Sequence, residues 1–254
     1  MKLELKNVTK VFRLSRKQMK ENKTNERYLT AVNDLSLNIE PGIIYGLLGP
    51  NGAGKTTTLR MIASLIKPKS GEILYNQKDI YKMDSDYRKE VGFLTSELKL
   101  DDFFTADYTF TYMSRLYGIP EKEIEDNKKR LFTTFGVTKF KDVQIKNLST
   151  GMKQKVSLAI SLVHQPNIII FDEPTNGLDI VASKEVEDFL LSIKDENRII
   201  VISTHIFSLA EKLCDKVGII ADGKLILETD KEQLKKENTS LEDLFFSVYK
   251  GGKE

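Results

Sequence analysis

Short apolar runs alternate along this chain with longer stretches in which apolar residues recur at helical spacing. Residues 43–48, 168–171 and 199–202 are apolar runs of the length of buried strands. Residues 152–163 carry an apolar face typical of a helix, and residues 180–194 are predicted to form another. This alternation predicts an α/β fold with a mostly parallel sheet and ligands at the carboxyl ends of its strands.

The remaining segments are predicted as follows. Strand patterns occupy residues 1–12 and 31–48, and a polar stretch between them, residues 13–27, reads as a loop or short solvated helix. Residues 97–148 switch to helical spacing, with turn signals at Gly118 and Gly136. Two short strands, at residues 217–221 and 224–228, and a small helical tail at residues 231–249 close the chain.

The helical stretch is rich in aromatic residues. Residues 93–148 hold seven of the 13 Phe and three of the nine Tyr. We expect most of these rings to pack in a local core and a minority to line a groove for a partner, because aromatic residues are favoured as interface anchors.

Composition excludes some classes of protein. Apolar content is 40%, charged content is 30% and the formal charge is +2 over 254 residues, so charge does not favour nucleic-acid binding. Since no apolar run approaches the ~18 residues of a membrane span, any membrane connection is expected through a partner. The single cysteine, Cys214, cannot form an intrachain disulfide, and the first residues read as a strand and not as a signal peptide.

The strongest chemical signal follows the first apolar run. The pattern G-x-x-x-x-G-K-[ST] of a phosphate-binding loop is met at every fixed position by Gly49, Pro50, Asn51, Gly52, Ala53, Gly54, Lys55 and Thr56, followed by Thr57. Glycines let backbone N–H groups approach phosphate oxygens, and the following helix adds the positive end of its dipole. Lys55 is predicted to reach the β- and γ-phosphates and Thr56 to ligate Mg²⁺.

Two carboxylates follow the apolar run at 168–171. Asp172 ends a predicted buried strand, where it is placed to hold Mg²⁺ or its water shell. Glu173 is placed to polarise a water molecule against the γ-phosphate. A strand that merely ends in acidic surface residues is the alternative, and the phosphate loop argues against it.

A third motif, Leu148-Ser149-Thr150-Gly151-Met152, completes a family resemblance. Together with the phosphate loop, the Asp-Glu strand, the segment 176–179 and His205, it makes the chain similar to the ATP-binding cassette (ABC) ATPases over essentially its whole length. Residues 93–98 and 148–155 most resemble the single-cassette subunits of multi-subunit exporters, including the sodium-extrusion type.

The resemblance implies further site residues. Ser149 and the Gly151 backbone would contact the γ-phosphate held by an opposite subunit, and Asp179 would lie in a loop that crosses the dimer interface. His205 would be the switch histidine that hydrogen-bonds the γ-phosphate, with a structural histidine as the alternative. Phe12 would stack on adenine, with a core aromatic as the alternative.

The chain departs from the family pattern in two places. Thr150 stands where a second glycine is usual and Met152 where a glutamine is usual, but backbone N–H donors survive such changes. The metal-contacting glutamine of the family is also absent. Ser96 aligns best with it as the metal residue, and Glu97 is its neighbour.

The resemblance also implies an architecture and partners. The expected fold is a RecA-like P-loop NTPase core (residues 1–96 and 149–230) with an N-terminal antiparallel β subdomain, an inserted α-helical subdomain (97–148) and a helical tail (231–254), all in one ABC ATPase domain. Expected ligands are ATP and Mg²⁺. Expected partners are membrane-spanning permease subunits and a second cassette, in a homodimer or heterodimer, on the cytoplasmic inner face of the cell membrane.

Other function classes fit the sequence less well. A non-transport cassette acting on a soluble macromolecule would usually show tandem cassettes or a long coiled coil, and neither is present. An unrelated P-loop kinase or GTPase is disfavoured by the Ser149 motif just before the Asp-Glu strand. A non-catalytic nucleotide-binding module is disfavoured because Lys55, Asp172, Glu173 and His205 are all present.

Overall fold

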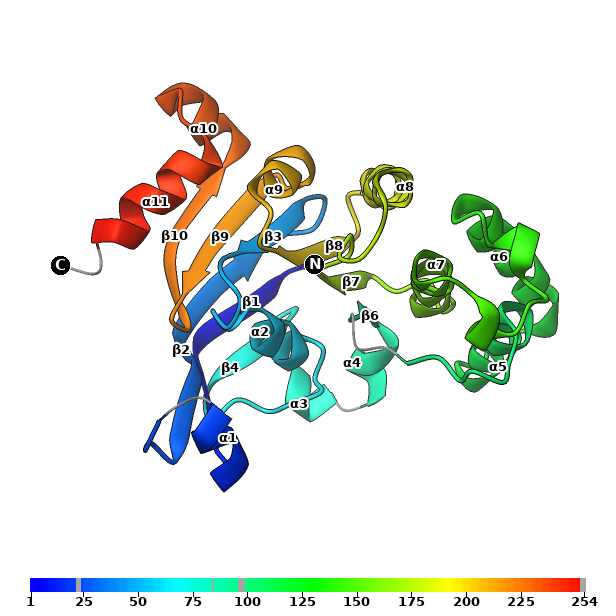
Figure 1. The fold of residues 1–254 in the computed structure, drawn as a ribbon, viewed down its shortest axis with the longest axis horizontal. Coiled ribbons are helices and arrows are strands. Elements are labelled where there is room, and N and C mark those ends of the chain that lie inside the picture. Colours follow the sequence, from blue (N-terminus) through cyan, green and yellow to red (C-terminus); the bar gives the residue numbers. More distant parts are fainter. Residues whose placement is uncertain (22–23, 84, 96–98, 252–254) are drawn as a thin grey trace. The chain divides into compact units, whose positions relative to one another are not determined.

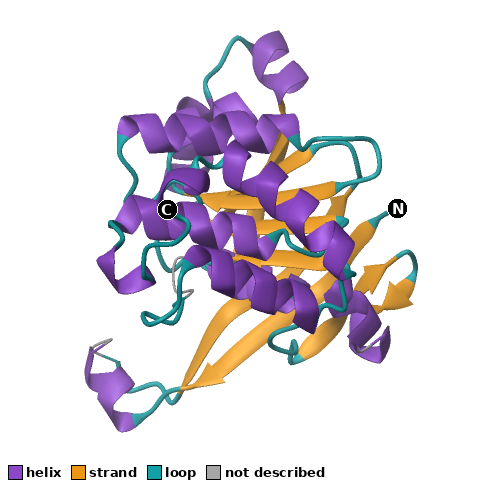
Figure 2. Cartoon of the chain, turned by 90° about the vertical axis from the view of Figure 1, so that its right-hand side faces the viewer, coloured by secondary structure: helices purple, strands orange, loops and turns teal. Residues whose placement is uncertain are grey.

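A computed structural model describes residues 1–21, 24–83, 85–95 and 99–251 of the chain. It divides into two compact units. The first unit comprises residues 1–88 and 195–254, and the second comprises residues 89–194. Strands and helices account for most of the chain, as Figure 2 shows.

The first unit holds both antiparallel and parallel strands (Figure 1). Its elements are β1 (Leu3–Arg13), α1 (Arg16–Glu21), β2 (Tyr28–Ile39), β3 (Ile44–Leu48), α2 (Lys55–Ile62), β4 (Ser70–Tyr75), β5 (Lys78–Asp79), α3 (Ile80–Met83), α4 (Ser85–Lys89, which ends one residue into the second unit), β8 (Ile199–Thr204), α9 (Phe207–Leu213), β9 (Lys216–Ala221), β10 (Lys224–Asp230), α10 (Lys231–Glu237) and α11 (Leu241–Gly251).

The second unit is mainly helical. Its elements are β6 (Val91–Leu94), α5 (Ala106–Leu116), α6 (Glu121–Thr134), the 3-10 helices η1 (Val137–Phe140) and η2 (Ile145–Asn147), α7 (Thr150–Ser161), β7 (Ile168–Asp172) and α8 (Ile180–Ser192). β6 and β7 pair in parallel, with Val91 opposite Ile168. These pairings and the alternation with helices confirm the predicted α/β class.

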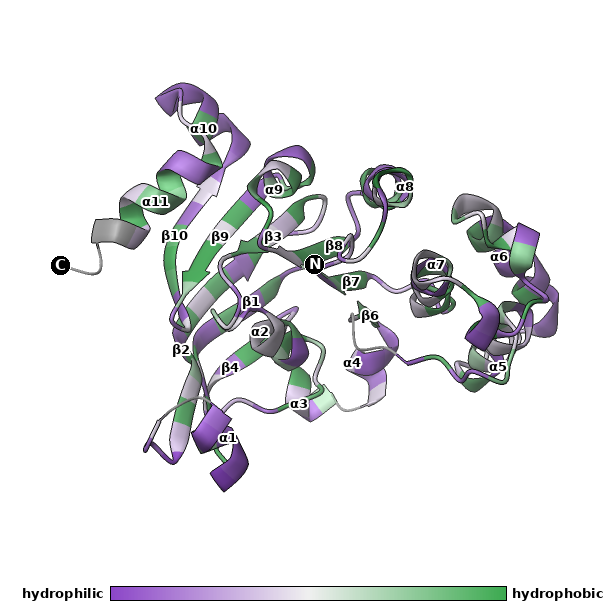
Figure 3. Ribbon diagram, viewed as in Figure 1, coloured by the Kyte–Doolittle hydropathy of each residue, from purple (hydrophilic) through white to green (hydrophobic). Residues whose placement is uncertain are grey.

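β3 is the central strand of the first unit. It pairs in parallel with β8 on one side and with β9 on the other, and all five of its residues are buried. Such strands are apolar on both faces, which explains the apolar run at 43–48 and the green colour of β9 in Figure 3. The strand pattern at 31–48 is divided between β2 and β3 by a turn at Pro41 and Gly42.

A separate sheet has the order β2-β1-β4-β5 and is antiparallel. The last β1–β4 partners are Thr9 and Ser70, whereas β1 and β2 stay paired as far as Arg13 and Tyr28. The two strands therefore continue as a two-stranded ribbon, and α1 lies at its end (Figures 1 and 2).

The aromatic residues of the helical stretch are distributed differently from our expectation. Phe110 and Phe132 pack edge to face with their ring centroids 5.2 Å apart, and Phe135 packs on Phe189 with a centroid distance of 4.3 Å. Five of the ten rings are exposed, however: those of Phe103, Phe104, Tyr108, Tyr112 and Tyr117. The expectation that most of the rings pack in the local core is wrong, because α5 packs inward through Ala106, Phe110 and Ser114.

One close approach in the first unit gives a stability test. A Cβ atom at Gly46, in β3, would lie 2.5 Å from the Sγ atom of Cys214. We expect Gly46→Ala to lower the free energy of unfolding by about 1–3 kcal/mol, because overpacking displaces neighbouring atoms. Adding Cys214→Ala removes the sulfur. The decrease in the free energy of unfolding of the double variant should therefore be smaller, by at least ~0.5 kcal/mol, than the sum of the decreases in the two single variants. Urea unfolding of all four proteins measures this coupling, and strict additivity would contradict it.

Candidate nucleotide-binding site

The phosphate loop joins the carboxyl end of β3 to the start of α2, as its sequence predicts. Gly54 precedes α2 with φ of 105°, and a Cβ atom there would lie 2.4 Å from the carbonyl oxygen of Ala31. Only glycine fits this position. Gly54 occupies the N-cap position of α2, where it has no side chain to accept a hydrogen bond from the helix. The dipole of α2 favours an anion at this end of the helix.

The ammonium group of Lys55 lies along the loop. The side chain is buried, and its Nζ atom donates hydrogen bonds to the carbonyl oxygens of Gly49, at 2.7 Å, and Pro50, at 3.2 Å. A lysine ammonium group in this loop is suited to a phosphate, because charge-assisted hydrogen bonds are stronger than neutral ones.

His205 lies beside this loop in the first unit. Leu48 and Thr204 are partners in the β3–β8 ladder, so the phosphate loop and His205 follow directly from neighbouring strand ends. Both contribute to one cavity of about 250 Å³, lined by Leu48, Gly49, Pro50, Asn51, His205, Phe207, Phe245 and Phe246. The sequence did not indicate the three phenylalanines as site residues, because nothing in the tail that carries Phe245 and Phe246 shows that it folds back to the loop and to Phe207 of α9.

Asp172 and Glu173 lie at the carboxyl end of β7, in the second unit. Asp172 is buried at the end of the strand. Glu173 has φ of 52°, a left-handed conformation that is uncommon for a residue with a side chain. Strained backbone of this kind clusters at active sites, where it fixes the direction of a side chain.

Ser149, Gly151 and Asp179 also lie in the second unit, at the starts of two helices. Ser149 caps α7 by accepting the N–H of Met152 at 3.3 Å, and Asp179 caps α8 by accepting the N–H of Ala182 at 2.8 Å. A Cβ atom at Gly151 would lie 3.8 Å from Cδ2 of Leu178, so the two helix starts are neighbours. Both capping residues are exposed.

The remaining residues predicted for the site are Phe12, Ser96 and its neighbour Glu97. Phe12 is 36% exposed and Lys10 Nζ lies 5.3 Å from its ring centroid, so it is not a core aromatic residue. Ser96 and its neighbour Glu97 lie outside the described residues. The predicted set is thus divided between the first unit (Phe12, the phosphate loop and His205) and the second unit (Ser149, Gly151, Asp172, Glu173 and Asp179).

The donor set is suited to Mg²⁺. Within the described ranges, no group of three or more His, Cys, Asp or Glu residues could hold a metal ion by itself. Mg²⁺ does not require one, since it is usually held by one or two protein oxygens together with waters and substrate phosphates. The Thr56 hydroxyl and the Asp172 carboxylate are hard oxygen donors of that kind.

The ABC transporter family matches residues 32–176 of the chain. The chain belongs to this family. It is 40% identical over 220 residues to the ABC transporter ATP-binding protein NatA of Bacillus subtilis, covering 86% of this chain and 89% of the relative. It is 38% identical over 209 residues to the bacitracin transport ATP-binding protein BcrA of Bacillus licheniformis, covering 82% and 67% of the two chains. The cassette is therefore an ATPase and an ATP-binding subunit of an ABC transporter, as predicted.

Solved cassettes have the same fold. An ATP-binding subunit of an ABC transporter matches with a TM-score of 0.83 and 25% identity, covering 98% of this cassette and 100% of that chain. A dimeric cassette in a post-hydrolysis state, bound to ADP and phosphate, matches with a TM-score of 0.79 and 25% identity, covering 90% and 98%. No helix among the described residues of this cassette is long and apolar enough to cross a membrane.

Lys55 gives the first functional test. We expect Lys55→Ala to weaken ATP binding about 10- to 100-fold, because hydrogen bonds to charged groups contribute about 1.5–3 kcal/mol. Equilibrium titration with a fluorescent ATP analogue measures the change. Lys69→Ala, at an exposed lysine outside the loop, is the matched control and should bind as the parent does. Equal affinities for the two variants would contradict the role of Lys55.

Proposed function

We propose that this cassette powers an exporter by closing with a second cassette around two MgATP molecules. The observation that supports this most directly is that each copy carries two kinds of phosphate-binding element. One is the phosphate loop with buried Lys55, and the other is the exposed pair of helix starts at Ser149 and Asp179. In a head-to-tail pair, the second element of each copy faces the phosphate loop of the other.

Each site residue then has a distinct role. Lys55 and the N–H groups of the phosphate loop bind the β- and γ-phosphates, and Phe12 stacks on the adenine. Thr56 and Asp172 would hold Mg²⁺, and Ser96 is a further predicted metal residue. Mg²⁺ would supply charge neutralisation at the phosphate oxygens.

The hydrolytic step depends on Glu173 and His205. The Glu173 carboxylate accepts a hydrogen bond from the attacking water and orients it toward the γ-phosphate, and the left-handed backbone holds the carboxylate in that direction. His205 donates a hydrogen bond to a γ-phosphate oxygen. Ser149 and the Gly151 N–H of the second copy close the site, which excludes water other than the reacting one.

The membrane subunits are proposed to dock on α5. The ring centroids of Phe104 and Tyr108 lie 4.6 Å apart, and those of Tyr108 and Tyr112 lie 6.2 Å apart. The three rings are exposed and form a row along one face of the helix. Such a row matches the anchors that a partner helix uses. The cassette would then lie on the cytoplasmic face of the membrane and hold no transport path of its own.

Export is the proposed direction, because one relative is named for it, the Nod factor export ATP-binding protein I of Cupriavidus metallidurans. The permease, which contains the path, would select the cargo.

Glu173→Gln tests the proposal. We expect the variant to bind ATP as the parent does but to lose at least ~100-fold in turnover, since it keeps the shape of the side chain and loses the carboxylate. Trapped ATP should also make it dimeric in light scattering with MgATP, alone or with its membrane subunits. Phosphate release measures the turnover, and Glu123→Gln, at an exposed acid of the same unit, is the control.

Ser149→Trp in the Glu173→Gln background checks the geometry of the pair. The bulky side chain should prevent dimer formation without changing ATP affinity. The reason is that, in the proposed pair, Ser149 contacts the nucleotide bound by the other copy and not the nucleotide bound by its own copy. Parental turnover in Glu173→Gln would overturn the catalytic role, and a monomer under every nucleotide condition would overturn the paired site.

A further inference from the structure

The cavity beside the phosphate loop has an aromatic wall built by the C-terminal tail. Phe207 of α9 packs on Phe245 and Phe246 of α11, with ring centroids 5.3 Å and 6.2 Å apart. α11 is fixed in place, since Leu241 is fully buried and its N–H donates to Glu211 Oε1 at 2.6 Å. Phe246 is nevertheless 42% exposed. The wall is therefore a preformed apolar surface that opens to solvent.

The second unit carries an apolar projection of matching character. Ile180 is 90% exposed and Val181 is 70% exposed at the first turn of α8, although isoleucine and valine are among the residues most often buried. They do not serve the core of their own unit, since α8 packs inward through Ala182, Val186, Phe189 and Leu190. The Asp179 cap fixes the start of the helix, so both side chains are held in a defined direction.

We propose that Ile180 and Val181 of one copy insert into the Phe207–Phe245–Phe246 cavity of a second copy when the cassettes close. This rests on the proposed function, in which Asp179, the preceding residue, crosses to the phosphate loop and His205 of the other copy. The cavity is lined by that same loop and by His205, so it continues the proposed interface. Two symmetric copies make two equivalent insertions and leave no projection or cavity unmatched.

This contact gives the tail a function in the ATPase cycle. The insertion places an aliphatic side chain against the wall next to His205 only in the closed pair. Closure around ATP then buries apolar surface that is exposed in the open state, and α11 becomes part of the switch.

The first experiment is a dimerisation titration. In the Glu173→Gln background with MgATP, Ile180→Ser should raise the dimer dissociation constant at least tenfold, because burial of an isoleucine contributes about 1.5–3 kcal/mol. ATP affinity of the single copy should not change. Leu191→Ser, at an exposed position on the same helix, is the matched control and should dimerise as its background does.

A cross-linking experiment locates the contact. One copy carries Ile180→Cys and the other carries Phe246→Cys, both in the Glu173→Gln background, and a disulfide between copies should form only with MgATP. The native Cys214 should not react, since burial raises its thiol pKa to about 12. A MgATP dimer that is unaffected by Ile180→Ser and gives no cross-link overturns the inference and leaves the paired site intact. Failure of the Glu173→Gln protein to dimerise at all overturns both.

A second inference comes independently from the end of the β1–β2 ribbon. The segment 13–27 is here called the ribbon tip, and its described residues, 13–21 and 24–27, include the helix α1 and local hydrogen bonds. Ser15 and Gln18 cap α1 reciprocally, with Gln18 N–H donating to Ser15 Oγ at 3.2 Å and Ser15 N–H donating to Gln18 Oε1 at 2.9 Å. Leu14 N–H donates to the Arg27 carbonyl oxygen at 2.9 Å, which closes the base of the tip.

The ribbon tip is strongly basic. It holds six basic and two acidic residues, a net charge of +4 in a chain whose total is +2. In the described part of the chain, Arg13, Arg16, Lys20 and Arg27 form no ion pair, and Lys17 has only an exposed contact with Glu21 at 3.9 Å. α1 is correspondingly among the most hydrophilic elements in Figure 3.

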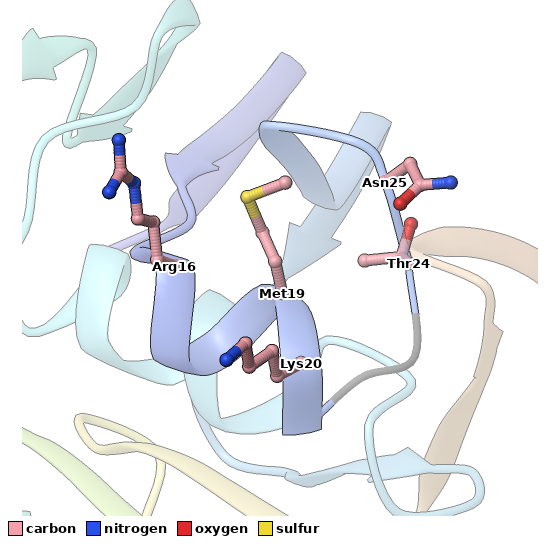
Figure 4. Close-up of a pocket in the computed structure, with 5 residues that line it drawn as sticks. All are labelled: Arg16, Met19, Lys20, Thr24 and Asn25. Atoms are coloured by element: carbon pink, nitrogen blue, oxygen red, sulfur yellow. The ribbon is translucent and has the colours of Figure 1, made fainter.

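Apolar groups accompany these charges. Tyr28 is 61% exposed and Leu29 is 46% exposed at the start of β2. An open cavity of about 360 Å³ is lined by Arg16, Met19 and Lys20 of α1 and by Thr24 and Asn25, which Figure 4 labels. Cationic groups beside a tyrosine and aliphatic side chains are the combination that binds the interface of a bilayer.

We infer that the ribbon tip binds an anionic membrane surface. Basic side chains gain about 1 kcal/mol each near such a surface, and the field extends over roughly a Debye length of ~8–10 Å. The ribbon places these groups at the far end of two strands, where they can approach headgroups without distorting the sheet.

The test compares two variants of equal charge. Replacement of Arg16, Lys17 and Lys20 by Gln should weaken binding to phosphatidylserine-rich vesicles about 100-fold at low salt, roughly fivefold per residue. Replacement of the exposed Lys122, Lys129 and Arg130 of α6 by Gln removes the same charge elsewhere and should have little effect. ATPase activity should be unchanged in both. Equal binding by the two variants, or equal binding of the parent to uncharged phosphatidylcholine vesicles, would overturn the inference.

Discussion

The parallel pairing of β3 with β8 and β9 is the constraint on which the nucleotide-binding half-site of the first unit depends. Every residue of β3 is buried, so the strand cannot slip by one residue without turning a side chain out of its packing. The register places Leu48 opposite Thr204 and opposite Ile219. The phosphate loop and His205 then begin at adjacent strand ends. Gly46, which has no room for a methyl group beside Cys214, is part of the same constraint.

Helix starts are used in two ways in this cassette. α2 begins after Gly54 with no side-chain cap, and its dipole favours an anion at this end of the helix. α7 and α8 begin with the capping residues Ser149 and Asp179, which are fixed by their own helices and remain exposed. The first arrangement suits direct binding of an anion. The second suits the presentation of polar groups to a nucleotide held by another copy, and a solved cassette to which this chain is similar is dimeric.

Two surfaces of this chain extend beyond the nucleotide site itself. The cavity at Phe245 and Phe246 adds apolar area beside the phosphate loop, so closure can draw on the hydrophobic effect as well as on ATP. The ribbon tip concentrates positive charge around α1, none of whose residues is buried. Both surfaces are suited to contacts with other molecules, the cavity with a second cassette and the ribbon tip with a lipid surface.

The sequence by itself determined the α/β class, the phosphate loop and the Asp172–Glu173 strand end, because each depends on neighbouring residues or on the burial of a short apolar run. It also identified the family. It did not determine which face of α5 packs inward, since periodicity shows that apolar residues share a face but not what covers it. Domain boundaries and the role of Ser96 stay predictions. The tertiary structure alone brought Phe245 and Phe246 to the phosphate loop, because contacts between segments so far apart in the chain are set by packing of whole elements and leave no local signal.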